Sequence, residues 1–357
     1  MFKVIEISPE IVGEVLAEDI FSESGMLLLK AGTVLTHRHI VILQNQIVGT
    51  KVKIKQAVTT NRTSFTMIAQ KEIELETLYE ESLSKIEEKL SLIKKEQVPH
   101  VDEVKEIYSP LLKEILSNDN LSSLLKIMHQ SSKTYIYAHS LNVSIMSALI
   151  GRILGKKGQE LFEIAEMGFF HDIGMLTVPE EILAKSSKLD AQEMHLIREH
   201  PSKGARILQK MGEKRQSIIM ASMFHHERID GSGYPKKITG PQIPYAIQIV
   251  TVADIFTAMT SPRPYKQAFS QLQACQEIMN DMLKGHLNPA IVVPLVRYIM
   301  RQHVRENVKL SDGRKGEIIF IHDNEPHQPL LRFEDGTYID LRRQPRTFIV
   351  NTLRTNS

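Results

Sequence analysis

Residues 161–174 read Leu-Phe-Glu-Ile-Ala-Glu-Met-Gly-Phe-Phe-His-Asp-Ile-Gly, an apolar run that ends in a histidine and an aspartate. A second run of the same kind, residues 217–226, reads Ser-Ile-Ile-Met-Ala-Ser-Met-Phe-His-His. Polar groups that close apolar runs are buried at a cost of several kcal/mol unless they are paired or bind a metal. The two stretches therefore indicate a helical core with a polar site inside it.

The spacing of apolar residues predicts helices through most of residues 120–308. Apolar side chains recur at helical intervals at positions 143, 146, 149, 150 and 153, and Gly155 suits a helix C-terminus. Asp190 followed by Glu193 has the pattern of a capping box, here for a helix that would contain Met194, Ile197 and His200. The expected fold class is mainly α.

Both ends of the chain are β-rich. The runs Phe-Lys-Val-Ile-Glu-Ile from residue 2 and Thr-Lys-Val-Lys-Ile from residue 50 predict strands, and Asp335-Gly336 suits a tight hairpin turn between short strands. We expect a small β-rich module at 1–58, a helical linker at 59–124, an all-helical domain at 125–308 and a small β module at 309–357.

Residues 69–97 contain neither glycine nor proline and carry an apolar seam at positions 79, 83, 86, 90 and 93. Two interpretations stay open. The seam forms a short coiled coil that joins two chains in a homodimer, or it packs one amphipathic helix on its own chain.

Composition excludes several classes of protein. Lys plus Arg number 44 and Asp plus Glu 42, so the net charge of +2 gives no support for binding a nucleic-acid polymer. The single cysteine, Cys275, excludes an intramolecular disulfide and favours a reducing, cytoplasmic setting. No uninterrupted apolar stretch approaches the ~18–20 residues that span a membrane, so no membrane-spanning segment is expected.

Seven polar residues fall at inward positions or helix ends. One histidine alone on an apolar face is more often a hydrogen-bonded core residue, but seven such residues together predict metal binding. Imidazole and carboxylate suit iron, manganese or zinc, and the absence of thiolates disfavours a structural zinc. Two divalent ions would leave the pocket positive, which suits a phosphate ester attacked by a metal-bound hydroxide. The candidate ligands are His139, His171, Asp172, His200, His225, His226 and Asp254.

Two loops follow these candidate ligands directly. Residues 226–235 contain two glycines and a proline and would present Tyr234 to stack on a base or to bond a phosphate. Arg263 stands between two prolines, which would hold its guanidinium rigidly for a phosphate. The alternative for both loops is ordinary turn chemistry.

The combination of motifs resembles one family, the HD-GYP branch of the HD-domain metal-dependent phosphohydrolases, over about residues 125–305. The motifs are His139-Ser140, His171-Asp-Ile-Gly174, His200-Pro201, His225-His226-Glu227, Asp230-Gly-Ser-Gly-Tyr-Pro235, Val252-Ala-Asp254 and Arg263-Pro-Tyr265. The resemblance implies an all-helical domain that hydrolyses the bacterial second messenger cyclic di-GMP to pGpG, GMP or both.

The resemblance also implies roles for the site residues. His139, His171, Asp172 and Asp254 would hold one metal, and Asp172 would bridge to a second metal held by His200, His225 and His226. Iron or manganese is the expected metal. Substrate contacts are expected from Tyr234, Arg263, Tyr265 and Lys185.

Two positions depart from the family pattern. Met175 replaces the lysine of His-Asp-x-Gly-Lys, a cation beside the substrate phosphate whose loss would cost on the order of 10²–10³ in rate. Lys185, Lys188 and Lys203 are the candidate replacements. Tyr135 replaces a glutamate that binds a third metal in some members, so two metals are expected.

Three functions follow from these observations. The first is a two-metal cyclic di-GMP phosphodiesterase slowed by Met175. The second is a degenerate member that binds metal and cyclic di-GMP and signals without turnover. The third, a hydrolase of another nucleotide, is disfavoured by the intact Gly233-Tyr234-Pro235 sequence.

Overall fold

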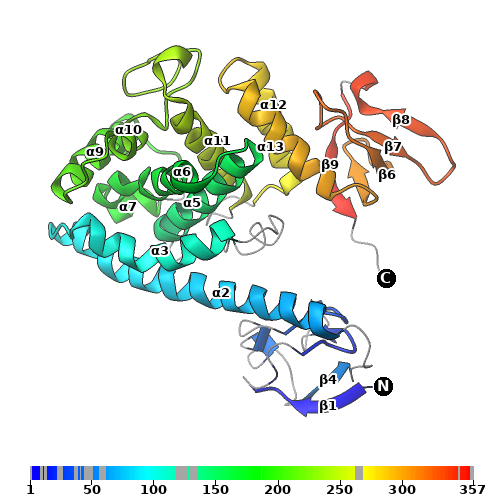
Figure 1. Ribbon diagram of the computed structural model, residues 1–357. Helices are drawn as coiled ribbons and strands as arrows, with labels where there is room; N and C mark the ends of the chain where they lie inside the picture. Colours follow the sequence, from blue (N-terminus) through cyan, green and yellow to red (C-terminus); the bar gives the residue numbers. More distant parts are fainter. Residues whose placement is uncertain are drawn as a thin grey trace. The chain divides into compact units, whose positions relative to one another are not determined.

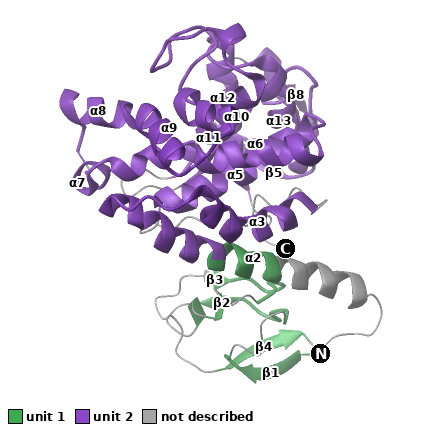
Figure 2. Ribbon diagram, turned by 60° about the vertical axis from the view of Figure 1, so that its left-hand side comes forward, with its two compact units in different colours: residues 1–81 green, residues 82–357 purple. Residues whose placement is uncertain are grey.

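The computed structural model describes residues 2–8, 11, 14–21, 27–35, 39–40, 42–43, 51–55, 62–117, 128, 135–185, 187–261, 268–344 and 346–353, with the backbone alone for 62–72. The chain divides into two compact units, Met1–Glu81 and Ser82–Ser357 (Figure 2).

The first unit contains the expected β-rich module. Strand β1 (Phe2–Glu6) pairs antiparallel with β4 (Lys51–Lys55), and β2 (Ile20–Phe21) pairs antiparallel with β3 (Leu27–Leu29). Buried aliphatic side chains, Leu16, Leu35, Leu43, Val52 and Ile54 among them, form its core. The sequence also predicts a short helix from Arg38, and most of that stretch lies outside the described residues.

Helix α2 (Arg62–Ser91) begins earlier than predicted and continues into the 3₁₀ turn η2 (Leu92–Lys95), which α3 (Val101–Ser117) follows. In the second unit the seam residues Leu83, Ile86, Leu90 and Ile93 are all buried within the single chain. An ion pair of 2.7 Å between Lys89 and Glu103 joins α2 to α3. This burial favours a helix packed on its own chain, and the homodimer stays a prediction.

A bundle of helices makes up most of the second unit and confirms the mainly α fold (Figure 1). Gly155 follows the end of α5 with φ +79°, and the capping box of Asp190 and Glu193 is present at the start of α8. The prediction that this helix contains His200 is wrong. Helix α8 ends at Arg198, and His200 is the first residue of α9. The elements are α5 (Tyr135–Ile153), α6 (Gly158–Phe170), η3 (Ile173–Thr177), α7 (Glu180–Leu183), α8 (Ala191–Arg198), α9 (His200–Lys210), α10 (Gln216–Phe224), η4 (Gly240–Gln242), α11 (Tyr245–Thr260), α12 (Gln271–Leu283) and α13 (Pro289–Gln302).

Helices α5 and α6 form the centre of this bundle. Every residue of α5 from Tyr137 to Gly151 is buried. Gly168 of α6 lies so close to α5 that a Cβ there would be 2.8 Å from the carbonyl oxygen of Val143 and 2.6 Å from Ser147 Oγ. The close approach leads α6 directly to His171 and Asp172 at its C-terminal end.

The C-terminal strands form one antiparallel sheet in the order β8-β7-β6-β5-β9. They are β5 (Asn307–Leu310), β6 (Lys315–Phe320), β7 (Leu330–Arg332), β8 (Tyr338–Asp340) and β9 (Ile349–Leu353). Gly336, with φ +82°, lies in the turn between β7 and β8, as the sequence predicts. The sheet shares a compact unit with the helices, and the predicted domain boundaries remain predictions.

Among the described residues, no helix has both the length and the apolarity that a bilayer crossing requires.

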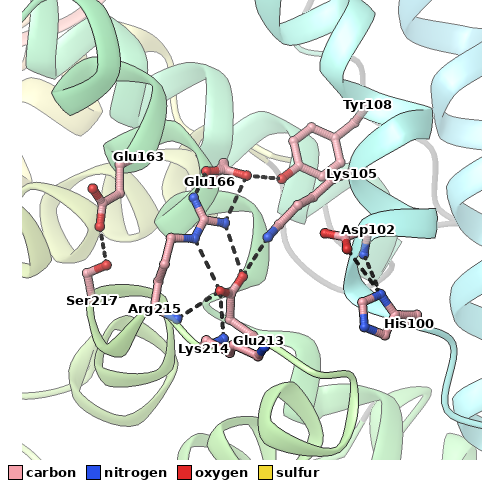
Figure 3. A network of polar contacts seen from close by, with 10 residues as sticks. All are labelled: His100, Asp102, Lys105, Tyr108, Glu163, Glu166, Glu213, Lys214, Arg215 and Ser217. Atoms are coloured by element: carbon pink, nitrogen blue, oxygen red, sulfur yellow. Dashed lines mark hydrogen bonds and ion pairs between the residues drawn. The ribbon is translucent and has the colours of Figure 1, made fainter.

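A buried network of charges ties α3 to α6 and to the loop before α10 (Figure 3). Arg215 forms ion pairs with Glu166 and Glu213, Lys105 lies 2.7 Å from Glu213, and the Tyr108 hydroxyl donates to Glu166 at 3.0 Å. Burial would raise the pKa of Glu213, but hydrogen bonds from Arg215 and Lys105 outweigh it and lower the pKa to about 2. Glu213 is therefore ionised at neutral pH.

We expect Glu213→Gln to destabilise the protein at pH 7 by about 2–3 kcal/mol, because a carboxyl whose pKa falls from its ordinary value of 4.5 to about 2 stabilises the folded state only while it is ionised. The wild-type advantage should be complete above pH 4.5 and should shrink as the pH falls toward 2. Urea unfolding at a series of pH values measures it. Glu160→Gln, which breaks the exposed Lys156–Glu160 pair, is the control, and an equal loss in both variants would contradict the expectation.

Candidate metal centre

Seven histidine and aspartate side chains converge at the centre of the helical bundle, and they are the seven that the sequence singles out. They come from α5, the C-terminal ends of α6 and α10, the start of α9, and α11. Their ligand atoms form two groups, and within each group all of them lie within 4.8 Å of one another. One group is His139, His171 and Asp254, and the other is Asp172, His200, His225 and His226.

The carboxylate of Asp172 faces both groups. Its Oδ1 lies 3.0 Å from His200 Nε2 and 3.5 Å from His225 Nε2. Its Oδ2 lies 3.9 Å from His139 Nε2 and 3.7 Å from His171 Nε2. A carboxylate with one oxygen directed at each of two histidine groups has the geometry needed to bridge two cations.

Backbone carbonyls orient three of the histidines. The Nδ1 atoms of His171, His200 and His225 lie 2.7, 2.6 and 2.9 Å from the carbonyl oxygens of Gly168, Ile197 and Ser222. A carbonyl only accepts, so the proton sits on Nδ1 and Nε2 is directed into the cluster, as for metal-binding histidines.

The Nε2 atoms of His200 and His225 lie only 3.2 Å apart. An imidazole that carries its proton on Nδ1 presents a lone pair at Nε2, so a cation between these two atoms would be bound by both. The residues therefore fit a divalent metal.

Within the cluster, the two aspartates and His171 favour their charged forms, whereas His226 favours its neutral form. Burial raises the pKa values of Asp172 and Asp254, but neighbouring histidines outweigh it and hold both pKa values well below the ordinary range. Burial and the nearby His225 hold the pKa of His226 well below its ordinary value. Burial would lower the pKa of His171, but Asp172 and Asp254 outweigh it and raise the pKa to about 9, so a metal ion there displaces a proton.

A contact between two glycines sets the distance from Asp172 to His200. A Cβ on Gly174 of η3 would lie 2.0 Å from the carbonyl oxygen of His200 and 2.7 Å from the amide nitrogen of Gly204. On the other side, Ser222 Oγ donates to the carbonyl oxygen of His171 at 3.0 Å. Only glycine at position 174 lets η3 lie this close to α9.

The loop after His226 is organised by Glu227, to which the sequence analysis assigned no role. Its side chain is buried and accepts backbone hydrogen bonds from Lys236, Lys237 and Ile238 at 2.6, 3.1 and 3.2 Å. Gly233 packs against the backbone of 226–228, where a Cβ would meet three atoms at 2.5 Å. In the sequence, Glu227 comes directly before a stretch whose glycines and proline predict a loop. Backbone N–H groups of such a loop need acceptors outside a helix or sheet, and this was the available signal.

This loop places Tyr234 against the candidate metal ligand His226. Its ring stacks on His226, with centroids 4.7 Å apart and an interplanar angle of 24°. Burial and the charges of Asp172 and Asp254 raise the pKa of Tyr234, so the hydroxyl keeps its proton. Tyr234 therefore lines the cluster, where its hydroxyl can donate a hydrogen bond.

Met175 lies in η3, and its amide donates to the carbonyl oxygen of Asp172 at 2.9 Å. Side chains three apart on a 3₁₀ turn are aligned, so position 175 shares a face with Asp172. Tyr135, at the position of the third-metal glutamate, stacks on His139 with centroids 5.6 Å apart.

The other predicted substrate contacts have different outcomes. Lys185 Nζ lies 2.6 Å from both carboxylate oxygens of Glu193, and Lys203 lies 3.0 Å from Glu199. Arg263 and Tyr265 fall outside the described residues. The substrate contacts of Lys185, Arg263 and Tyr265 stay predictions.

The chain is similar to known proteins over its helical domain. Residues 116–291 match the HD domain family. The chain is 32% identical over 212 residues to the cyclic di-GMP phosphodiesterase PA4108 of Pseudomonas aeruginosa, covering 59% of this chain and 50% of that protein. It is 37% identical over 131 residues to the cyclic di-GMP phosphodiesterase response regulator RpfG of Xanthomonas campestris, covering 36% and 34%.

A third relative is the 3'3'-cGAMP-specific phosphodiesterase 2 of Vibrio cholerae, 33% identical over 165 residues, with 45% of this chain and 31% of that protein covered. The chain thus spans about half the length, or less, of these curated relatives. Among solved structures, the HDGYP protein Bd1817 of Bdellovibrio bacteriovorus superposes with a TM-score of 0.52 at 18% identity, covering 83% of this chain and 98% of that one. That likeness supports the fold alone.

The fold is that of a helical HD domain, and the cluster of histidines and aspartates lies inside it. Residues 116–291 carry the HD domain, and the resemblance of this region to the HD-GYP branch is confirmed.

We expect Gly174→Ala to destabilise the protein by about 2–3 kcal/mol or more, because the added Cβ meets rigid backbone and must push η3 away from α9. The shift separates Asp172 from His200, so metal content should fall as well. Thermal unfolding and elemental analysis measure the two effects. Gly151→Ala, whose Cβ meets chiefly the flexible end of Leu161, is the control. A Gly174→Ala protein with wild-type stability and metal content would contradict this account.

Proposed function

We propose that the protein is a two-metal phosphodiesterase that hydrolyses cyclic di-GMP to pGpG, GMP or both in the cytoplasm. The observation that carries the proposal is the Asp172 carboxylate, with one oxygen directed at each of two histidine groups. The relatives named cyclic di-GMP phosphodiesterases, at 32% and 37% identity, support the choice of substrate.

His139, His171, Asp172 and Asp254 would hold one metal, and Asp172 with His200, His225 and His226 the second. Iron or manganese fits this set of imidazole and carboxylate ligands without thiolates. Bound there, the two ions would supply an activated water and stabilise the charge that develops on the phosphodiester.

The residues of the chain prepare the site for this chemistry. The carbonyl oxygens of Gly168, Ile197 and Ser222 hold three imidazoles in one orientation before substrate arrives. Tyr234 covers His226 on one side and would stack on a guanine base or donate to a phosphate. Arg263 and Tyr265 complete the proposed contacts, and Lys185 would have to leave Glu193 to take part.

Turnover by purified protein tests the proposal. Protein reconstituted anaerobically with Fe²⁺ or with Mn²⁺ should convert cyclic di-GMP to pGpG or GMP, as resolved by chromatography. The 3'3'-cGAMP relatives provide the competing substrate. Faster hydrolysis of 3'3'-cGAMP would replace cyclic di-GMP as the substrate, and no hydrolysis of either would remove the enzyme proposal.

We expect about two transition-metal ions per chain in the wild-type protein and a loss of most metal in Asp172→Ala, because the substitution removes the shared carboxylate and leaves two cations unshielded. Elemental analysis after anaerobic purification measures the content. Glu199→Gln, beside His200 in sequence but paired with Lys203, should keep both ions. Retention of both ions by Asp172→Ala would refute the ligand assignment.

Position 175 carries the second candidate, a binding protein without turnover, because methionine cannot supply the cation of the family's lysine. We expect Met175→Lys to raise the rate of cyclic di-GMP hydrolysis at saturating substrate by about tenfold or more, with metal content unchanged. Steady-state kinetics measures it, with Met175→Gln as the uncharged control.

Two other results are informative. Brisk wild-type turnover that Met175→Lys does not improve would mean that another cation has the role. If the wild type and Met175→Lys both fail to hydrolyse cyclic di-GMP, although each holds two metals and binds it, the result would favour a binding protein without turnover.

A further inference from the structure

A cation lies on the outer side of the Tyr234 ring. The guanidinium carbon of Arg198, at the last residue of α8, is 5.5 Å from the ring centroid. The ring itself stacks on His226, with centroids 4.7 Å apart. Since His226 covers one face of the ring, Tyr234 forms the layer between the metal ligands and the charge of Arg198. The cation therefore stands one aromatic layer beyond the cluster.

Arg198 is the cation that lies over the Tyr234 ring. Lys185 is paired with Glu193 and Lys203 with Glu199. The Arg228 guanidinium keeps its charge as well and donates to the carbonyl oxygen of Glu227 at 3.1 Å, whereas Arg198 is the one that lies over the ring. Arg198 is exposed, and among the described residues no carboxylate lies within ion-pair distance of it. The ring contact orients the guanidinium while its N–H groups stay open to a ligand.

The position of this charge matches one feature of a cyclic dinucleotide. Such a molecule carries two phosphodiesters on opposite sides of one ring, so when one lies at the metals the other is held several ångströms away. The Tyr234 ring stands between these two positions. A guanidinium just past that ring is placed for the phosphate that is not cleaved, and it can bond two of its oxygens at once.

We propose that Arg198 binds the uncleaved phosphate of the cyclic dinucleotide and so makes the site select substrates with two phosphodiesters. The inference rests on the proposed function and deepens it. Arg198 touches substrate but not the reacting phosphate, so it contributes to substrate affinity rather than to the chemical step. It does not replace the lysine missing at position 175, whose role lies at the cleaved phosphate.

The test compares a substrate with two phosphodiesters with a substrate that has one, using the full chain loaded with Mn²⁺. For Arg198→Gln we expect KM for cyclic di-GMP to rise about tenfold or more, since a charge-assisted bidentate contact is lost, with kcat within threefold of wild type. Hydrolysis of bis(4-nitrophenyl) phosphate, which has one phosphodiester, should not change. Arg198→Lys keeps the charge and should recover part of the affinity.

Arg206→Gln is the matched control, because it removes an equal charge from an exposed position on α9. Equal KM values for cyclic di-GMP in Arg198→Gln and Arg206→Gln would overturn the inference and leave the proposed function intact. Equal losses on both substrates would also overturn it, since they would place Arg198 at the cleaved phosphate or in the fold.

Failure of the proposed function has a different signature. If wild-type protein does not cleave cyclic di-GMP, calorimetric titration of the Mn²⁺-loaded protein with cyclic di-GMP takes the place of KM. Binding that Arg198→Gln weakens tenfold supports the inference without the enzyme. Binding that is unchanged, or absent in the wild type, overturns it.

Discussion

The carboxylate of Asp172 faces two groups of histidines, one oxygen toward each, and the surrounding helices are arranged so that it can. The ends of α6 and α10 and the start of α9 must meet within hydrogen-bond distance of one another. That convergence depends on a backbone contact between η3 and α9 at Gly174 and Gly204, where a side chain at position 174 has no room. The site is therefore as rigid as the packing of the bundle.

A second buried carboxylate, that of Glu227, organises the loop beside the cluster. Glu227 accepts three backbone hydrogen bonds from the loop that carries Tyr234, and the Tyr234 ring rests on His226. The candidate ligand His226 and the loop that carries Tyr234 are thus continuous in sequence and in space, since His226 and Glu227 are adjacent. This continuity explains how a short loop without secondary structure can hold an aromatic ring in a fixed place beside the cluster of histidines and aspartates.

The positively charged side chains near the cluster differ in position and in their partners. Position 175, aligned with Asp172 on one 3₁₀ turn, carries a methionine, and Lys185 and Lys203 are committed to glutamates. The charge of Arg198 lies beyond Tyr234. A site with its metal ligands and outer cation intact and its inner cation missing would bind substrate better than it turns it over, because charge at the cleaved phosphate acts mainly in the transition state.

The sequence alone determined the helical core, the capping box at Asp190, the turn at Gly336 and the seven polar residues of the cluster. Periodicity, capping, turn chemistry and the cost of burying polar groups are local properties that a sequence displays. The resemblance to a family divided those residues between two metals. Only the tertiary structure decided which oxygen of Asp172 faces which group, which carbonyls orient the histidines, that Glu227 holds the loop, and that Glu193 holds Lys185. Most of these contacts depend on distances between segments that lie far apart along the chain, and even the nearby ones depend on side-chain orientations that no sequence pattern states.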